Sequence, residues 1–147
     1  MTEAHAFPQA RGGCQCGAIR FTIAPGLAKA SLCHCRMCQR ASGNVFVPLY
    51  EIPAERIAWQ GVEPQEWASS NISQRGFCPT CGTPLYLRTG DTYEIMAGCL
   101  HPDFPFTPAD QGGMEARSTW LDALAKIPSH DTTPALLAQV VSNQSAE

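Results

Sequence analysis

The chain has 147 residues, an apolar fraction of 44% and a formal net charge of −3, so it can build the core of one domain. The acidic balance excludes the basic footprint of nucleic-acid-binding proteins and gives no attraction to anionic membranes. No apolar run approaches the roughly 20 residues of a membrane span, and the first eight residues lack the features of a secretory signal. We therefore expect one cytoplasmic domain over residues 1–147, with no nucleic-acid or membrane partner.

Short strands separated by turn signals follow one another over the first two thirds of the chain. Ile19, Phe21 and Ile23 alternate with polar residues, as in a strand with one buried face, and Pro25-Gly26 ends it as a turn. Residues 32–38 are expected to form a strand end that runs into a short helical turn. Further strands are expected at 45–50, 56–60, 66–70, 72–77, 85–87 and 93–97. This pattern predicts a mainly β domain.

The pattern weakens after Cys99. Pro102, Pro105 and Pro108 cannot occupy a helix interior or a central strand. Residues 120–126 are consistent with one or two helical turns. Residues 131–147 are mostly small and polar, and we expect a marginal helix or a disordered tail there. The core of the domain should therefore lie within about residues 8–125.

Seven of the eight cysteines form three tight clusters, Cys14-Gln15-Cys16, Cys33 to Cys38 with Cys35 between, and Cys78-Pro79-Thr80-Cys81. In a reducing compartment such clusters more often indicate metal than disulfides. A disulfide scaffold and an iron–sulfur cluster are the alternatives, but the spacings resemble zinc knuckles more than ferredoxin patterns. The partition predicts two zinc ions, one in a closed four-sulfur site for the fold and one in an open three-sulfur site for function.

Cys78 and Cys81 can hold one tetrahedral ion when the backbone curls around it, and Gly82 permits the positive φ that such a turn requires. The pair needs two more ligands, for which Cys14 and Cys16 are the natural candidates. The alternative is four separate buried thiols, which requires a coincidence of spacing at both pairs.

Cys33, Cys35 and Cys38 can face a second ion from one tight turn and leave one coordination position for water or a substrate thiol. The alternative is that Cys99 or a histidine closes this site. His34 is expected to point away from the ion, in a supporting or surface role, because neighbours on an extended segment face opposite sides. For Cys99 the default expectation is a small buried hydrophobe.

Three segments of the chain carry a resemblance to a known family: Gly13-Cys14-Gln15-Cys16-Gly17-Ala18-Ile19-Arg20-Phe21, Cys33-His34-Cys35-Arg36-Met37-Cys38-Gln39-Arg40-Ala41-Ser42-Gly43 and Arg75-Gly76-Phe77-Cys78-Pro79-Thr80-Cys81-Gly82-Thr83-Pro84-Leu85-Tyr86. They resemble the glutathione-dependent formaldehyde-activating enzyme family, which includes centromere protein V. The resemblance covers about residues 8–125. It implies a β-tent-like fold of small antiparallel sheets around zinc, with a structural zinc on Cys14, Cys16, Cys78 and Cys81 and a catalytic zinc on Cys33, Cys35 and Cys38.

The resemblance also implies a carbon–sulfur lyase that joins glutathione and formaldehyde into S-hydroxymethylglutathione, or splits it. The chain departs from the family pattern at Gly98-Cys99-Leu100-His101, where many members carry Gly-x-Leu-Asp, and at Gly112-Gly113, where a histidine is frequent. The first hypothesis is therefore a zinc enzyme acting on a small thiol such as glutathione, with His101 and Asp103 as candidate acids. The second is a non-catalytic zinc module that binds a partner protein.

Overall fold

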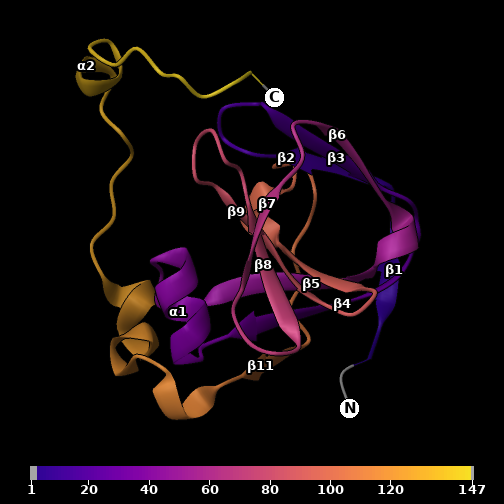
Figure 1. The fold of residues 1–147 in the computed structure, drawn as a ribbon. Helices are drawn as coiled ribbons and strands as arrows, with labels where there is room; N and C mark the ends of the chain where they lie inside the picture. Colours follow the sequence, from indigo (N-terminus) through magenta and orange to yellow (C-terminus); the bar gives the residue numbers. More distant parts are fainter. Residues whose placement is uncertain (1–2, 147) are drawn as a thin grey trace.

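The computed structural model describes residues 3–146, and in this part of the chain the strands form two sheets (Figure 1). The larger has eight strands among the described residues, and the smaller has three. The larger sheet runs β1 (His5–Phe7), β4 (Gly26–Cys33), β5 (Val47–Pro53), β10 (Thr92–Met96), β9 (Pro84–Thr89), β8 (Ser73–Phe77) and β7 (Gln65–Ala68), with β11 (Asp110–Gly112) also beside β4. The smaller runs β2 (Ala10–Gly13), β3 (Ile19–Ile23) and β6 (Ile57–Gly61).

Helical structure is sparse and short. One α-helix, α1 (Arg36–Ser42), lies close to the larger sheet, and a second, α2 (Pro134–Leu137), stands apart from both sheets in Figure 1. No helix among residues 3–146 has the length and apolar character needed to cross a membrane. The 3₁₀ segments are η1 (Ala54–Arg56), η2 (Ala97–Cys99), η3 (Met114–Ala116) and η4 (Thr119–Lys126).

The mainly β prediction is confirmed, and the expected strands lie within a few residues of β3, β5, β6, β7, β8, β9 and β10. Three short strands, β1, β2 and β11, were not expected, because three or four residues are too few to show a period. Pro25-Gly26 also leads directly into the eight-residue strand β4, of which only the end was expected. The expected helical turns at 120–126 are η4, and the tail contains the single turn α2.

The larger sheet separates two groups of buried side chains. On β5, Tyr50 and Ile52 join the main core, whereas Val47 and Leu49 join a smaller cluster with Cys38. The alternation follows from the pleat, which sends successive side chains to opposite faces. The main core fills the space toward the smaller sheet. The smaller cluster lies on the opposite face, where α1 packs.

The main core is completed by the buried face of β3. Ile19, Phe21 and Ile23 are at most 1% exposed, and burial of each such side chain contributes about 1.5–3 kcal/mol. Trp59 of β6 joins the two sheets, with its ring centroid 5.1 Å from that of Phe21 and 5.3 Å from that of Tyr86 on β9. The position of the smaller sheet is therefore set by aromatic packing against the larger one.

Candidate metal centres

The first cysteine pair sits in the tight turn between β2 and β3. Cys14 N–H donates to the carbonyl of Ile19 at 3.1 Å, and Gly17 adopts φ 84°, a conformation that favours glycine. The amide of Ile19 donates to Cys14 Sγ at 3.2 Å. The turn thus brings the two sulfurs to 3.6 Å from each other and supplies an N–H group to one of them.

The second pair sits in a similar turn between β8 and β9. Gly82 N–H donates to the carbonyl of Cys78 at 2.9 Å, with Gly82 at φ 77°, as the sequence predicted. The hydroxyl of Thr83 accepts from the amide of Gln15 at 3.1 Å and lies 3.1 Å from Cys81 Sγ. One threonine therefore links the two turns, which are far apart in the sequence.

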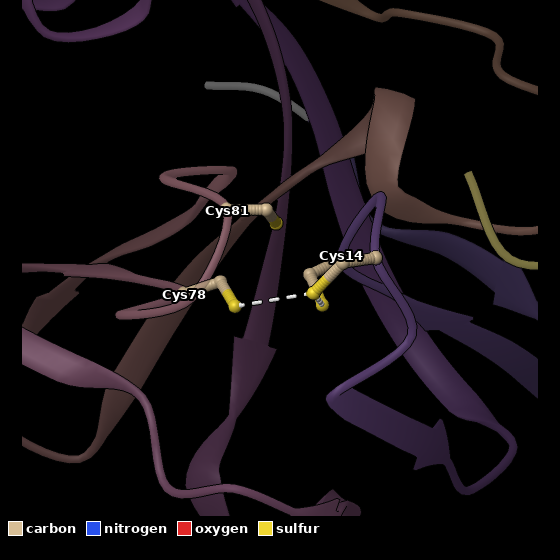
Figure 2. Close-up of side chains that lie close together, drawn as sticks. Cys14, Cys78 and Cys81 are labelled. Carbon is tan, nitrogen blue, oxygen red and sulfur yellow. Dashed lines mark hydrogen bonds between the residues drawn. The ribbon is translucent and has the colours of Figure 1, made fainter. Parts of the chain in front are cut away.

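The two turns bring four sulfurs together. The Sγ atoms of Cys14, Cys16, Cys78 and Cys81 all lie within 4.8 Å of one another, and Figure 2 shows the labelled side chains pointing toward a common centre. A tetrahedral zinc ion with metal–sulfur bonds of about 2.3 Å requires sulfur–sulfur edges of about 3.8 Å. The Cys14–Cys16 and Cys16–Cys78 separations are 3.6 and 3.9 Å, so this donor set fits zinc.

Two of the four thiols, Cys14 and Cys81, have pKa values shifted toward the metal-binding thiolate form, whereas hydrogen bonds from neighbouring thiols help to raise the pKa of Cys16 to about 11. A hydrogen bond with the Thr83 hydroxyl is the main cause that lowers the pKa of Cys81 to about 6. Burial raises the pKa of Cys14, but the amide of Ile19 and neighbouring thiols lower it, and the net direction is down. Because a metal binds thiolates rather than thiols, these hydrogen bonds favour metal binding.

The third cluster straddles the end of β4 and the start of α1. Cys33 is the last residue of β4, Cys35 is the N-cap of α1, and its sulfur accepts from the amide of Cys38 at 3.4 Å. Capping by an acceptor at this position satisfies one of the free N–H groups of the first turn. Helix capping and sulfur clustering are therefore achieved by the same backbone geometry.

The three sulfurs lie within 4.8 Å of one another, with Cys33 and Cys35 at 3.4 Å. No other Cys, His, Asp or Glu of residues 3–146 places a ligand atom within 4.8 Å of all three. Burial raises the pKa of Cys38, and the guanidinium of Arg75, whose Nη2 lies 3.6 Å from its sulfur, acts in the opposite direction. The group is thus a three-donor set with an adjacent positive charge.

A segment formed by β11 and η3, here called the strap, makes hydrogen bonds with residues next to the three cysteines. His34 N–H donates to the carbonyl of Gly112 at 2.9 Å, and His34 Nε2 lies 3.0 Å from Gln111 Oε1. The side-chain Nε2 of Gln39 donates to the backbone carbonyls of His34 and Ala116 at 2.7 and 2.9 Å. His34 is 1% exposed, so it supports the cluster from the interior and is not a surface residue.

The remaining sequence candidates lie elsewhere. Cys99 is half-buried between the two cysteine groups, its thiol donates to the carbonyl of Pro84 at 3.2 Å, and burial raises its pKa to about 12. It therefore stays a neutral thiol. His101 lies beside Arg11, with its Nε2 2.8 Å from Arg11 Nη2, and Asp103 is next to it.

A cavity of about 370 Å³ is connected to the three-cysteine group through Arg75, although none of the three cysteines lines it. Arg75 lines it and also contacts Cys38, and Ala41 of α1 and Met96 of β10 form the wall nearest the cysteines. The remainder includes the aromatic and apolar residues Trp67, Phe77, Pro84 and Tyr86 and the polar residues Gln65 and Glu66. Neither Arg75 nor Trp67 is a candidate site residue from the sequence alone, although both belong to expected strands. Only the pairing Trp67↔Arg75 across β7 and β8 brings them together.

Comparison with known proteins agrees with this architecture. A family model described as glutathione-dependent formaldehyde-activating enzyme matches residues 9–112. A Schizosaccharomyces pombe protein whose curated name is "uncharacterized lyase" is 30% identical over 79 residues, which are 54% of this chain and 57% of the relative. The chain thus spans little more than half the length of that relative.

A solved structure shows the same fold. The crystal structure of a Rhodobacter sphaeroides protein superimposes with a TM-score of 0.56 at 18% sequence identity, and the match covers 69% of this chain and 98% of the other. At this level of identity the likeness shows the fold alone.

Proposed function

Because the chain belongs to the glutathione-dependent formaldehyde-activating enzyme family, we propose that it is a zinc-dependent carbon–sulfur lyase. It would form or cleave a thiol–aldehyde adduct such as S-hydroxymethylglutathione. The observation that carries the proposal is the three-sulfur group, which lacks a fourth Cys, His, Asp or Glu ligand among residues 3–146 and contacts Arg75, a residue that lines a cavity. Zinc sites that act on substrates keep one position free in this way.

The two cysteine groups would have different roles. Cys14, Cys16, Cys78 and Cys81 supply four thiolates between the two sheets, which suits a structural zinc ion. Cys33, Cys35 and Cys38 would hold the second ion. Zinc at that position supplies a Lewis acid that keeps a substrate thiol deprotonated and polarises a carbonyl.

Arg75 is the side chain best placed to assist the proposed reaction. Three thiolates around a divalent ion leave a net charge of about −1, and the guanidinium beside Cys38 offsets it. An arginine has five N–H donors, so Arg75 has donors left for the aldehyde or hydroxymethyl oxygen of a substrate in the cavity that it lines. It would orient that oxygen and stabilise negative charge developing on it.

The cavity walls would hold the organic part of the adduct. Phe77, Tyr86 and Met96 offer apolar surface, and the exposed indole of Trp67 extends it toward solvent. Such walls exclude water and strengthen the electrostatic contacts inside.

The proposal is tested by following exchange between isotope-labelled formaldehyde and glutathione by NMR. We expect exchange faster than the spontaneous reaction with the intact protein, and loss of this excess in Cys35→Ser. Cys99→Ser is the matched control, because Cys99 belongs to neither sulfur group and serine can keep the hydrogen bond to Pro84.

Exchange at the spontaneous rate would contradict the glutathione–formaldehyde assignment. A second measurement follows thiol binding in cobalt-substituted protein through the visible spectrum. If added thiols also left that spectrum unchanged, a non-catalytic module that binds a partner protein would be the better account.

A further inference from the structure

A second cavity, of about 430 Å³, lies against the smaller sheet. Its polar wall is one face of that sheet, because the pairings Arg11↔Thr22 and Arg20↔Gln60 place these four side chains on the same side. No Asp or Glu of residues 3–146 lines it. In a chain with net charge −3, a cavity with two arginines and no carboxylate is an unusual concentration of positive charge.

The side chain of Arg11 is held in place by His101, which in turn contacts Asp103. Arg11 donates through Nη2 to His101 Nε2 at 2.8 Å, so Nε2 accepts with its lone pair. Nδ1 lies 3.3 Å from the backbone nitrogen of Asp103 and 3.3 Å from Asp103 Oδ2. The backbone repeats the link, since His101 N–H donates to the carbonyl of Arg11 at 2.9 Å. Arg11 is thereby oriented while its other N–H groups remain beside the cavity.

The second arginine is anchored and then covered by the tail. Arg20 Nη1 donates to the carbonyls of Cys14 and Ile19 at 3.1 and 3.2 Å, and its Nη2 donates to the hydroxyl of Ser145. Ser145 N–H donates to the carbonyl of Gln15 at 2.9 Å. In Figure 1 the chain after α2 returns to the end of the smaller sheet. A neutral oxygen from the tail therefore occupies a donor that an anion would bind more strongly.

We propose that this cavity binds a small molecule through an oxyanion group, a carboxylate or a phosphate, held between Arg11 and Arg20 in place of the Ser145 hydroxyl. Diagonal neighbours on paired strands lie about 7–8 Å apart, a spacing that long arginine side chains can close around one anion. The volume lies within the range of ordinary ligand sites, about 300–1,000 Å³. Neither Cys33, Cys35 nor Cys38 lines the cavity, so this site does not depend on the lyase proposal.

The test is an NMR titration of the metal-loaded protein with inorganic phosphate and, in a separate arm, with succinate, both at constant ionic strength. We expect saturable shifts of the amides of Gly12, Gly13 and Ser145, and the arm that saturates at lower concentration identifies the preferred anion. Arg11→Gln should weaken binding at least tenfold, whereas Arg40→Gln, an exposed arginine on α1, should leave it unchanged. Ser145→Ala should tighten binding up to about fivefold, because one competing hydrogen bond is lost.

Arg11 is exposed on an edge strand and holds no cysteine turn, so Arg11→Gln tests binding rather than folding. The NMR spectrum of this variant without added anion checks that it is folded. The proposal is overturned if neither anion gives saturable shifts at these amides. It is equally overturned if Arg11→Gln and Arg40→Gln reduce the shifts to the same extent, since that would indicate diffuse charge screening.

Discussion

Gly113 packs against the backbone of Cys35 so closely that a Cβ at Gly113 would lie 2.5 Å from Cys35 N. Gly113 also adopts φ 68°. Gly113 joins β11 to η3 within the strap, so the strap can pack against the three-cysteine group in this way only with glycine at this position.

The first prediction follows from this contact. Gly113→Ala should lower the free energy of unfolding by more than the roughly 1–2 kcal/mol of left-handed backbone strain, and it should weaken metal binding by the three-cysteine group. Gly90→Ala is the control, because Gly90 has φ 58° and nothing within 4 Å of the added Cβ. Denaturant unfolding and metal content measure both effects. Equal losses in the two variants would show that the strap does not support the site.

The second prediction is metal stoichiometry. Protein prepared without chelators should contain close to two zinc ions per chain, because two separate groups of sulfurs have zinc-compatible spacing. Mass spectrometry under native conditions checks the count. One ion per chain, or iron in place of zinc, would remove the basis of the proposed reaction centre.

The third prediction separates the two groups. Metal binding to a structural site can contribute about 10–16 kcal/mol to folding, which equals or exceeds the stability of a typical domain, about 5–15 kcal/mol. Cys78→Ser should therefore leave the chain largely unfolded. Cys35→Ser should lose one ion and keep the circular dichroism spectrum of the parent. Unfolding of Cys35→Ser to the same extent would show that both ions are structural.

The fourth prediction concerns Arg75. Arg75→Gln removes the positive charge beside Cys38, which should lower the zinc affinity of the three-cysteine group by about 10- to 100-fold, the usual effect of losing a partner of a metal ligand. Competition with a chromophoric chelator measures the affinity, and Arg40→Gln on the exposed face of α1 is the control. An unchanged zinc affinity would show that Arg75 lines the cavity but does not stabilise the metal at the three-cysteine group.

The fifth prediction is a pH dependence of stability. Arg88 donates to both carboxylate oxygens of Glu66, at 2.9 and 2.7 Å, and these bonds lower the pKa of Glu66. A lowered pKa in the folded state contributes stability that is present above the unfolded value, about 4.3, and is lost as the pH falls through the folded value. Glu66→Gln should thus cost about 1 kcal/mol at pH 7.

That difference between parent and Glu66→Gln should shrink as the pH falls below about 4. Tyr86, whose hydroxyl donates to Glu66 at 3.0 Å, can still donate to the glutamine oxygen, so the variant keeps this bond while it loses the charge and one acceptor for Arg88. Thermal unfolding of both proteins across this range provides the measurement. A difference that stayed constant with pH would assign the effect to packing.

The sequence by itself determined the features that depend on neighbours along the chain. The alternation of Ile19, Phe21 and Ile23 is a local consequence of strand geometry, and it predicted β3 correctly. The pairing of Cys78 with Cys81 depends on one turn that Gly82 permits, and the triple cluster on one helix N-terminus. Short-range spacing is enough for such sites because a few backbone angles bring the sulfurs together.

The tertiary structure decided everything that depends on strand order and on which face a side chain occupies. Cys14 meets Cys78 because Trp59 and the core hold the smaller sheet against the larger one. Arg75 reaches Cys38, and Gly113 reaches Cys35, only after distant strands have paired. Such contacts leave no periodic signal in the sequence, because the free energy that creates them comes from burial and pairing across the whole domain.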